Sequence, residues 1–399
     1  MFAKSQSGFG ISLLSVLIVR KMIKKSRRFT YVFLTATLSP LVAIGFFNGI
    51  VDPYGIFNSP KISGFNQVKP AKFYNDRLFK AIEITQIQPK VILLGSSRTQ
   101  WGLDPQHPAF DEPTYNLALQ GANMHETLRY FQHAIANQSQ LKTVVLGIDF
   151  FMFTDLPNKL IFKESRLEKK YITFEDAISV LFSLDALETS QKTIEENKTE
   201  SETHEFLDGL LLVDPRKPLP GSLEEFTKFI VRGFKEKDEA TLSQQKLEFF
   251  QALVNLCQNR RIKLKIFISP AHAMQWEASR LNGEWETFEQ WKREIVKIAP
   301  VWDFSGYNSI TTEPITEQMN HYIDSSHYRK EVGDVILSRI LDDQTETVPD
   351  DFGVLLTPDN IEAHLEKIRG DRERWVKNNP EAVQLLLDIK SDVAETEKN

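Results

Sequence analysis

The sequence contains only one cysteine, Cys257, among its 399 residues. A single thiol excludes an internal disulfide framework and every zinc or iron–sulfur site that needs several cysteine ligands. The chain also shows no internal repeat. Its composition, 41% hydrophobic and 26% charged, is that of a globular protein, so we expect a sizeable buried core.

Acidic residues are absent from the first 28 positions, which hold seven Lys or Arg. Because the whole chain has a net charge of −6, the remainder carries −13. An acidic body repels the phosphate backbone of nucleic acids, so we expect no nucleic-acid partner.

Charge of either sign is absent from residues 29–50, a stretch of 22 positions. At the rise of an α-helix this stretch is roughly 33 Å long, the thickness of a bilayer core, and it predicts one transmembrane helix. Residues 1–28 form a basic flank, whereas residues 51–68 carry one base, Lys61. The positive-inside rule therefore predicts a single-pass membrane protein with a cytoplasmic leader, residues 1–28, and a periplasmic or extracellular body.

Two other interpretations of this stretch remain, a cleavable signal peptide and a core helix of a soluble protein. Ala43-Ile44-Gly45 forms a small-x-small cleavage pattern. The apolar run is longer than the core of a typical signal peptide, so we favour an uncleaved signal anchor. A soluble lipase with a removed leader would instead begin near Phe46.

Short, continuous apolar runs occur along the body, and amphipathic helical patterns alternate with them. Continuous runs suit strands that are buried on both faces of a parallel sheet. The runs occupy residues 91–94, 115–119, 144–146, 264–268 and 301–304, and the helical patterns occupy residues 71–87, 126–136, 242–256 and 329–341. The alternation predicts an α/β domain over residues 51–343, with a mainly parallel sheet and helices on both faces.

Two regions fall outside this alternation. Residues 158–238 are polar, charged and weakly periodic, and we interpret them as an insertion of helices and loops around the sheet. Residues 344–399 are predicted to form a helical C-terminal extension. Thr357-Pro358 and Asn379-Pro380 suit the first positions of helices there.

Ligands of open α/β sheets bind beyond the carboxyl ends of the strands. Gly95-Ser96-Ser97-Arg98 follows the first predicted strand, and Asp324-Ser325-Ser326-His327 follows the last one. A serine with histidine as its base, and with a carboxylate that orients the imidazole, can form an acyl-enzyme. Either motif alone is common as an ordinary turn. Their order allows the fold to bring them together, with Ser97 or its neighbour Ser96 as the nucleophile.

Three blocks of the sequence resemble the SGNH (GDSL-like) hydrolases, and within them the membrane-anchored branch of the alginate O-acetylation proteins J and X and the D-alanyl transfer protein D. The blocks are VILLGSSRTQWGLDP, YNLALQGANMHET and YIDSSHY. The resemblance implies a flavodoxin-like three-layer α/β/α fold. It also implies that Ser97 is the nucleophile, that Asp324 orients the base His327, and that the amides of Ser97 and Gly121 bind the oxyanion.

A further block of that family departs from its pattern in this chain. The family has Gly-x-Asn-Asp, whose asparagine is another oxyanion donor, whereas this chain has Gly147-Ile148-Asp149-Phe150. An ionised Asp149 would repel an oxyanion. Either it points elsewhere, or it is protonated, or the oxyanion depends on the two amides alone. Arg98 is a candidate source of positive charge, with a salt-bridged surface arginine as the alternative.

Substrate-binding candidates follow strands at the same edge of the predicted sheet. They are Arg98, Asn116 and His272, and a loop-capping role is the alternative for His272. We expect neither a metal nor a cofactor.

These patterns predict a membrane-anchored serine esterase or O-acyltransferase that acts on a cell-surface glycan or a similar hydroxyl acceptor. The resemblance implies a role in polysaccharide modification in the cell envelope, with a multi-pass membrane partner that supplies the acyl group. The alternative is a catalytically inactive, SGNH-like scaffold of an envelope polysaccharide-modification complex, suggested by Asp149 and by the long insertion and tail.

Overall fold

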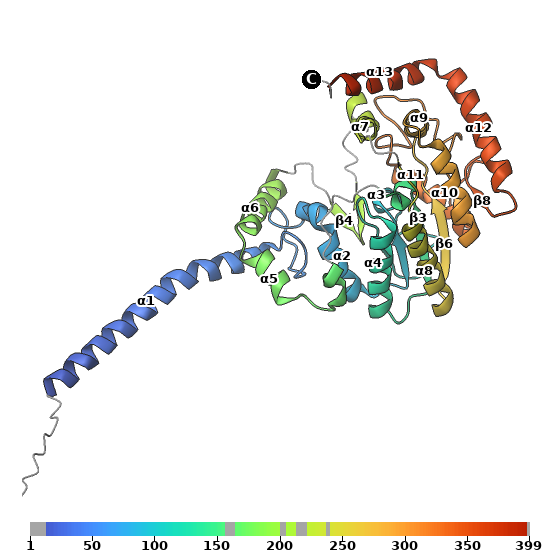
Figure 1. Ribbon diagram of the computed structural model, residues 1–399. Coiled ribbons are helices and arrows are strands. Elements are labelled where there is room, and N and C mark those ends of the chain that lie inside the picture. The colour runs from blue at the N-terminus through green and yellow to red at the C-terminus, as the bar shows by residue number, and fades with distance from the viewer. Residues whose placement is uncertain (1–12, 156–163, 200–204, 213–221, 237–239, 397–399) are drawn as a thin grey trace, which may run out of the picture.

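The computed structural model describes residues 13–155, 164–199, 205–212, 222–236 and 240–396. Within this part of the chain the centre is a six-stranded sheet with the strand order β2-β1-β3-β6-β7-β8 (Figure 1). The strands are β1 (Val91–Leu94), β2 (Thr114–Asn116), β3 (Thr143–Ile148), β6 (Lys263–Ile268), β7 (Val301–Asp303) and β8 (Val354–Leu356). All neighbours pair in parallel except β8, which runs antiparallel to β7. The predicted α/β class with a mainly parallel sheet is confirmed.

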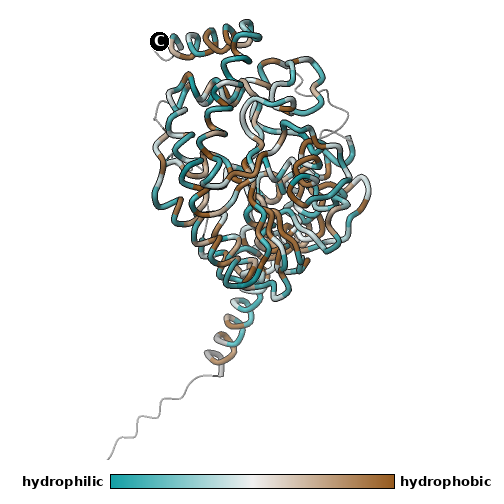
Figure 2. The backbone as a smooth tube through the Cα atoms, turned by 90° about the vertical axis from the view of Figure 1, so that its right-hand side faces the viewer, coloured by the Kyte–Doolittle hydropathy of each residue, from teal (hydrophilic) through white to brown (hydrophobic). Residues whose placement is uncertain are grey.

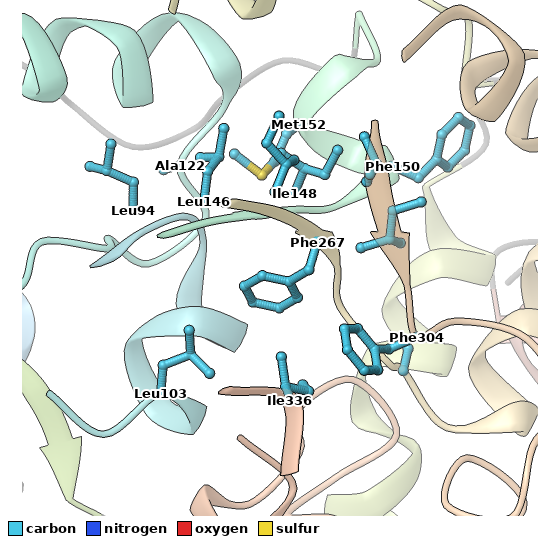
Figure 3. Close-up of a cluster of buried hydrophobic side chains, with 14 of the residues drawn as sticks. Leu94, Leu103, Ala122, Leu146, Ile148, Phe150, Met152, Phe267, Phe304 and Ile336 are labelled. Atoms are coloured by element: carbon cyan, nitrogen blue, oxygen red, sulfur yellow. The ribbon is translucent and has the colours of Figure 1, made fainter. Parts of the chain in front are cut away.

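Helices cover both faces of this sheet. On one face α8 contacts both α4 and α10, and on the other α3 contacts α11. Their bounds are α3 (Ser97–Gly102), α4 (Met124–Asn137), α8 (Gln244–Arg260), α10 (Trp285–Ile298) and α11 (Lys330–Leu341). Figure 3 shows Leu146, Ile148 and Met152 on one side of the strands, and Phe267 and Ile336 on the other. The apolar runs are continuous because both faces of the strands are buried.

The helices differ from the prediction in two places. The pattern at residues 71–87 divides into a 3-10 turn, η1 (Pro70–Asn75), and α2 (Asp76–Ile87). The region between β6 and β7 holds two helices, α9 (Ala273–Leu281) and α10, and the alternation predicts neither of them. Both have buried tryptophans, Trp276 and Trp291, so aromatic packing rather than a regular aliphatic stripe places them against the core.

The predicted insertion, residues 158–238, forms helices and a small sheet of its own. Its described elements are η3 (Glu164–Glu168), α5 (Phe174–Leu181), α6 (Leu184–Thr199), β4 (Glu205–Leu207), β5 (Leu210–Leu212) and α7 (Leu223–Lys235). The antiparallel β4–β5 pair is a correction, because only helices and loops are predicted there. The β4–β5 turn joins the main sheet, since Asp208 O accepts a hydrogen bond of 2.8 Å from Asn116 N.

A single long helix, α1 (Leu13–Val51), projects from the body (Figures 1 and 2). Its stretch Val16–Val51 is long and apolar enough to span a membrane, and the side chains of residues 20–43 are all exposed. The basic part of the predicted leader is continuous with the predicted span from Leu13 on, so these two segments are one element. The first 12 residues of the leader lie outside the described residues.

The C-terminal extension packs on the end of the body that lies away from α1 (Figure 1). It is not wholly helical as predicted, because β8 adds an edge strand to the main sheet before α12 (Ile361–Asn378) and α13 (Pro380–Thr396). Arg372 of α12 forms a pair of hydrogen bonds of 2.7 and 2.9 Å with Glu277. The helix α13 packs against α7 and α9, so the extension is part of the domain.

Candidate active site

Ser97 is the first residue of α3, and the two-residue turn Gly95-Ser96 separates it from the end of β1. Ser96 caps the helix, and its side chain accepts a hydrogen bond of 3.2 Å from Arg98 N. Gly95 makes the turn with φ 150°, and a Cβ at this position would collide with the Thr99 side chain. Ser97 therefore stands at the carboxyl end of the sheet, where its side chain is partly exposed.

Ser97, His327 and Asp324 form a continuous hydrogen-bonded chain. Nε2 of His327 lies 2.8 Å from Ser97 Oγ, and Nδ1 lies 3.0 Å from each carboxylate oxygen of Asp324. An ionised carboxylate only accepts, so Nδ1 carries the proton and Nε2 is free to accept from the serine hydroxyl. The structure thus brings together the three predicted triad residues, which we call the triad cluster.

Asp324 is buried and held by its own loop. Its Oδ1 accepts hydrogen bonds of 2.8 Å from the backbone N–H groups of Ser326 and His327, and Lys228 Nζ lies 3.4 Å from Oδ2. Burial alone would raise the pKa of Asp324, but the neighbouring His327, Lys228 and the backbone hydrogen bond outweigh it and hold that pKa below its ordinary value. Asp324 is therefore ionised at neutral pH and able to orient the imidazole.

Aromatic rings enclose the imidazole on two sides. The Trp101 ring stacks on His327 with centroids 4.4 Å apart, and Phe229 makes an edge contact at 5.0 Å. Sequence reasoning assigned no role to Trp101, Phe229 or Lys228. Trp101 lies four residues after Ser97 on the same helix. Residues at this spacing lie on the same face of a helix, so the sequence does indicate that Trp101 is near the serine. Phe229 and Lys228 belong to α7 of the insertion, where no local signal points to the triad.

A second polar cluster lies beside the triad and consists of Ser96, Asp149, Arg98 and Ser326, called the Ser96 cluster below. Ser96 Oγ donates to Asp149 Oδ2 at 2.5 Å, and Arg98 Nη1 donates to Asp149 Oδ1 at 2.8 Å. Arg98 Nε and Nη2 both donate to Ser326 Oγ, at 3.1 and 3.0 Å. All four residues are buried.

This arrangement decides between the interpretations of Asp149 and Arg98. Both carboxylate oxygens of Asp149 accept hydrogen bonds, from Ser96 and from Arg98, so the carboxylate has no proton to donate to an oxyanion. Arg98 is not a surface arginine, because only 9% of its side chain is exposed. Its three guanidinium nitrogens are all hydrogen-bonded within the protein, which does not favour the predicted contact with substrate.

The side chain of Asn116 has a structural role rather than the predicted contact with substrate. Its side-chain NH₂ donates to the carbonyls of Thr99 and Leu103, each at 2.9 Å, and its Oδ1 accepts from Ala118 N at 3.1 Å. The side chain is fully buried and ties the end of β2 to α3. The correction has a simple cause, since a buried amide takes the backbone partners nearest to it.

His272 also has a structural place, the loop-capping alternative of the two predicted. It caps α9, accepting from Met274 N at 3.2 Å with Nδ1, while Nε2 donates to Glu313 O at 2.8 Å. Burial lowers the pKa of His272 to about 4. A neutral imidazole with both nitrogens engaged does not serve as a base or as a substrate contact.

The two backbone N–H groups predicted as oxyanion donors belong to Ser97 and Gly121. Ser97 N stands at the first position of α3, where helix N–H groups have no partner within the helix. Gly121 has φ 58°, and its loop is joined to the turn that precedes Ser97, because Leu119 N donates to Gly95 O at 3.1 Å. Neither Ser97 N nor Gly121 N donates a hydrogen bond to any other described residue.

In the described part of the chain, no group of three or more His, Cys, Asp or Glu could hold a metal ion. The chain matches no protein-family model, no curated protein and no solved structure. The geometry and chemistry of the site are therefore the ground for assigning a function.

Proposed function

We propose that the chain is a membrane-anchored serine esterase or O-acyltransferase of the SGNH type. The observation that carries the proposal is the hydrogen-bonded chain from Ser97 through His327 to Asp324. A serine that meets an imidazole held in the accepting tautomer is the arrangement that acyl transfer uses on several unrelated folds. The partial exposure of Ser97 leaves room for a carbonyl group to approach.

The sheet supports the proposed flavodoxin-like, three-layer SGNH architecture. Its parallel strands have the order β2-β1-β3-β6-β7, and in sheets of this order ligands bind at the switch point between the first and third strands. Ser97 follows β1 and Asp149 follows β3, so the two polar clusters lie at that switch point.

In the proposed reaction Ser97 Oγ attacks the carbonyl carbon of an ester while its proton moves to Nε2 of His327. The bond to the leaving oxygen then breaks, and His327 returns the proton to that oxygen. Water or a sugar hydroxyl attacks the acyl-enzyme with His327 again as the base, which restores Ser97. Asp324 stabilises the imidazolium, and the N–H groups of Ser97 and Gly121 are the proposed oxyanion donors.

The long apolar helix supports the proposed location. The basic residues of α1 lie on the N-terminal side of its uncharged stretch, residues 29–50, so the positive-inside rule favours a body in the periplasm or outside the cell. The hydroxyl acceptor proposed there is a cell-surface glycan or a similar molecule. The multi-pass partner that supplies an acyl group stays a prediction from the resemblance.

Fluorophosphonate labelling of the detergent-solubilised full-length protein, read by intact mass, tests the proposal. We expect one adduct on the wild-type protein and on Ser96→Ala, and none on Ser97→Ala. Ser309→Ala is the matched serine control, because Ser309 is exposed and donates to Asp351 outside the site. Circular dichroism checks that each variant is folded.

Two results would contradict the proposal. The absence of an adduct on folded wild-type protein would favour the alternative of an inactive envelope scaffold. An adduct that persists in Ser97→Ala but is lost in Ser96→Ala would mean that Ser96, rather than Ser97, is the nucleophile.

A further inference from the structure

An exposed apolar surface lies on the outer side of α5 and at its two ends. It consists of Tyr171, Phe174, Ile178, Phe182 and Leu184, called the α5 patch below. Phe174, Ile178 and Phe182 recur at every fourth position and so share one face of the helix, where they are 81, 44 and 43% exposed. Tyr171 and Leu184 are 78 and 76% exposed. Large apolar side chains exposed together mark a surface for interaction.

The opposite side of α5 is packed firmly on the body. Val180 is buried in a small core with Ile56, Phe79 and Ile82. Thr173 begins the helix with a capping box, in which its side chain accepts from the backbone N–H of Asp176 at 3.1 Å. The helix is therefore a fixed element that holds the α5 patch outward.

The α5 patch adjoins the part of α1 that leaves the predicted membrane span. A Cβ at Gly45 would collide with the Phe182 ring, so these two residues are in close contact. Asn48 Nδ2 donates to Leu181 O at 2.8 Å, and Asn48 Oδ1 accepts from Ser190 Oγ at 2.8 Å. Both Gly45 and Asn48 belong to the last two turns of the uncharged stretch, so the packing of α5 on α1 starts inside that stretch.

We propose that the α5 patch lies in the interfacial layer of the membrane that α1 spans, with outer-leaflet lipid as its partner. From Gly45 to the end of the uncharged stretch at Ile50, α1 rises about 8 Å. That height matches the depth of roughly 5–10 Å at which interfacial amphipathic helices bury their apolar face. The inference rests on the proposed membrane anchor and adds a second lipid contact to it.

Two features of the neighbouring surface favour lipid over a protein partner. Phe46 and Ile50 of α1 are 70 and 40% exposed, so the exposed apolar surface of the predicted span reaches the turns on which α5 packs. Lys169 and Lys170 are exposed and directly precede Tyr171. Basic residues beside aromatic ones are typical of the layer in which lipid phosphates lie.

The end of α1 is held so that the two lipid contacts act together. Asp52 follows the helix with φ 48°, and its carboxylate accepts from Ile56 N at 2.9 Å and from Lys69 Nζ at 2.8 Å. Asn66 Nδ2 donates to Ile50 O at 3.0 Å. No loose linker separates the span from the body, so the span and the α5 patch together set the tilt of the body on the membrane.

Lipid-dependent quenching of a fluorescent label tests this inference. The full-length protein is placed in nanodiscs of phosphatidylcholine and phosphatidylglycerol, with an environment-sensitive label on Phe174→Cys or, in a second variant, Leu184→Cys. Leu387→Cys is the matched control, because Leu387 is 43% exposed on α13, away from α1. Phe33→Cys, within the predicted span, reports the anchor. Cys257 is buried in the core, and the unsubstituted protein gives its background.

Nitroxide-labelled lipid is expected to quench the labels at 174 and 184 several-fold more than the label at 387, while a water-soluble nitroxide does the reverse. Fluorophosphonate labelling of Ser97 on the same samples reports the proposed activity separately.

If the label at 33 is quenched by lipid but the labels at 174 and 184 are not, the α5 patch does not contact lipid, although α1 still anchors the protein. If lipid does not quench the label at 33 either, α1 does not span the membrane, and both the proposed anchor and this inference are wrong. If the label at 174 escapes lipid quenching and the unlabelled Phe174→Cys protein, when oxidised, forms a disulfide between two molecules, the patch belongs to a contact with a second copy of the chain.

Discussion

Ser96 and Ser97 are neighbours in the chain, yet their hydroxyls belong to different polar clusters. Ser97 is partly exposed, and its Oγ lies 2.8 Å from Nε2 of the His327 imidazole. Ser96 is fully buried and donates to Asp149, which is also paired with Arg98. An imidazole takes up and returns a proton near neutral pH, whereas an ion-paired carboxylate only accepts the hydrogen bond. The partner, rather than the serine, separates the hydroxyl of the proposed nucleophile, Ser97, from the structural donor, Ser96.

Ser326 joins the two clusters. Its backbone N–H donates to Asp324 Oδ1 at 2.8 Å, and its hydroxyl accepts from Arg98. The Ser96 cluster therefore holds the loop that carries Asp324 and His327 against the nucleophile turn. The comparison predicts that substitutions in the triad cluster abolish chemistry, while substitutions in the Ser96 cluster first reduce stability.

The largest effect is expected for Ser97→Ala. Removing the nucleophile should lower the hydrolysis of p-nitrophenyl acetate by about 10⁴-fold or more, with thermal unfolding unchanged, because the side chain is partly exposed. The measurement is the steady-state rate beside a melting curve. Substantial turnover in this variant would remove the contrast between the two serines.

The next largest effect is expected for Asp324→Asn, a fall in kcat of about 10³–10⁴-fold. The asparagine oxygen can still accept the two backbone N–H groups of its loop. The NH₂ group that replaces the other carboxylate oxygen only donates, however, so it favours the imidazole tautomer in which Nδ1 accepts. In that tautomer Nε2 carries the proton and cannot accept from Ser97. Stopped-flow acylation by an activated ester measures the step directly. A loss of less than about tenfold would show that the carboxylate does not orient the base.

Asp149→Ala should act on stability rather than on the acylation step itself. It leaves the Arg98 guanidinium buried without its partner, which costs about 3–5 kcal/mol in the free energy of unfolding. Urea denaturation measures this loss. The double variant Asp149→Asn/Arg98→Met, which removes both charges, should recover much of it. Equal instability of the single and double variants would mean that the two charges are not coupled.

Ser96→Ala is expected to have a smaller effect, about 1–2 kcal/mol in the free energy of unfolding, because it removes a helix cap and one hydrogen bond to Asp149. Activity should fall far less than in Ser97→Ala. Urea denaturation and ester hydrolysis on the same preparations provide the comparison. A loss of turnover as large as that of Ser97→Ala would contradict the structural role of Ser96.

The smallest effect is expected in the dependence of stability on pH. The pKa of Asp324 is held below its ordinary value, so its ionised form stabilises the folded state above roughly pH 4. That contribution is lost as the pH falls through the lower, folded-state pKa. Urea midpoints measured below pH 4 should therefore decline more steeply for the wild-type protein than for Asp324→Asn. Parallel slopes would mean that Asp324 titrates alike in both states.

The strands and the triad motifs could be predicted because their signals are local. The run at β1 matches residues 91–94 as predicted, since four consecutive apolar side chains need burial on both faces. Gly95 and Ser97, and likewise Asp324 and His327, are close in sequence and each pair is set by one loop. The strand predicted at residues 115–119 is instead β2 at Thr114–Asn116, because the apolar run continues into a loop at Leu117 and Leu119 that is buried without being a strand.

Other parts of the site could not be predicted, because their partners come from distant segments. The orientation of Asp149 depends on Arg98, 51 positions earlier, and Arg98 in turn reaches Ser326, 228 positions later. Phe229 lies in a weakly periodic insertion, and only the packing of α7 brings it to His327. The position of Asn116 and His272 at the ends of strands predicts a substrate contact for both, with loop capping as the alternative for His272. In the structure both side chains are hydrogen-bonded to nearby backbone carbonyls.

The sequence by itself determined the long apolar helix, the alternation of strands and helices, and the order of the serine and Asp-x-x-His motifs. These features depend on hydropathy and on contacts a few residues apart, which the chain carries in any conformation. Only the tertiary structure decided which serine meets the imidazole, where Asp149 points, that β8 completes the sheet, and that the α5 patch lies beside α1. The physical reason is that burial and long-range partners set the role of a polar or apolar side chain, and both exist only once the chain has folded.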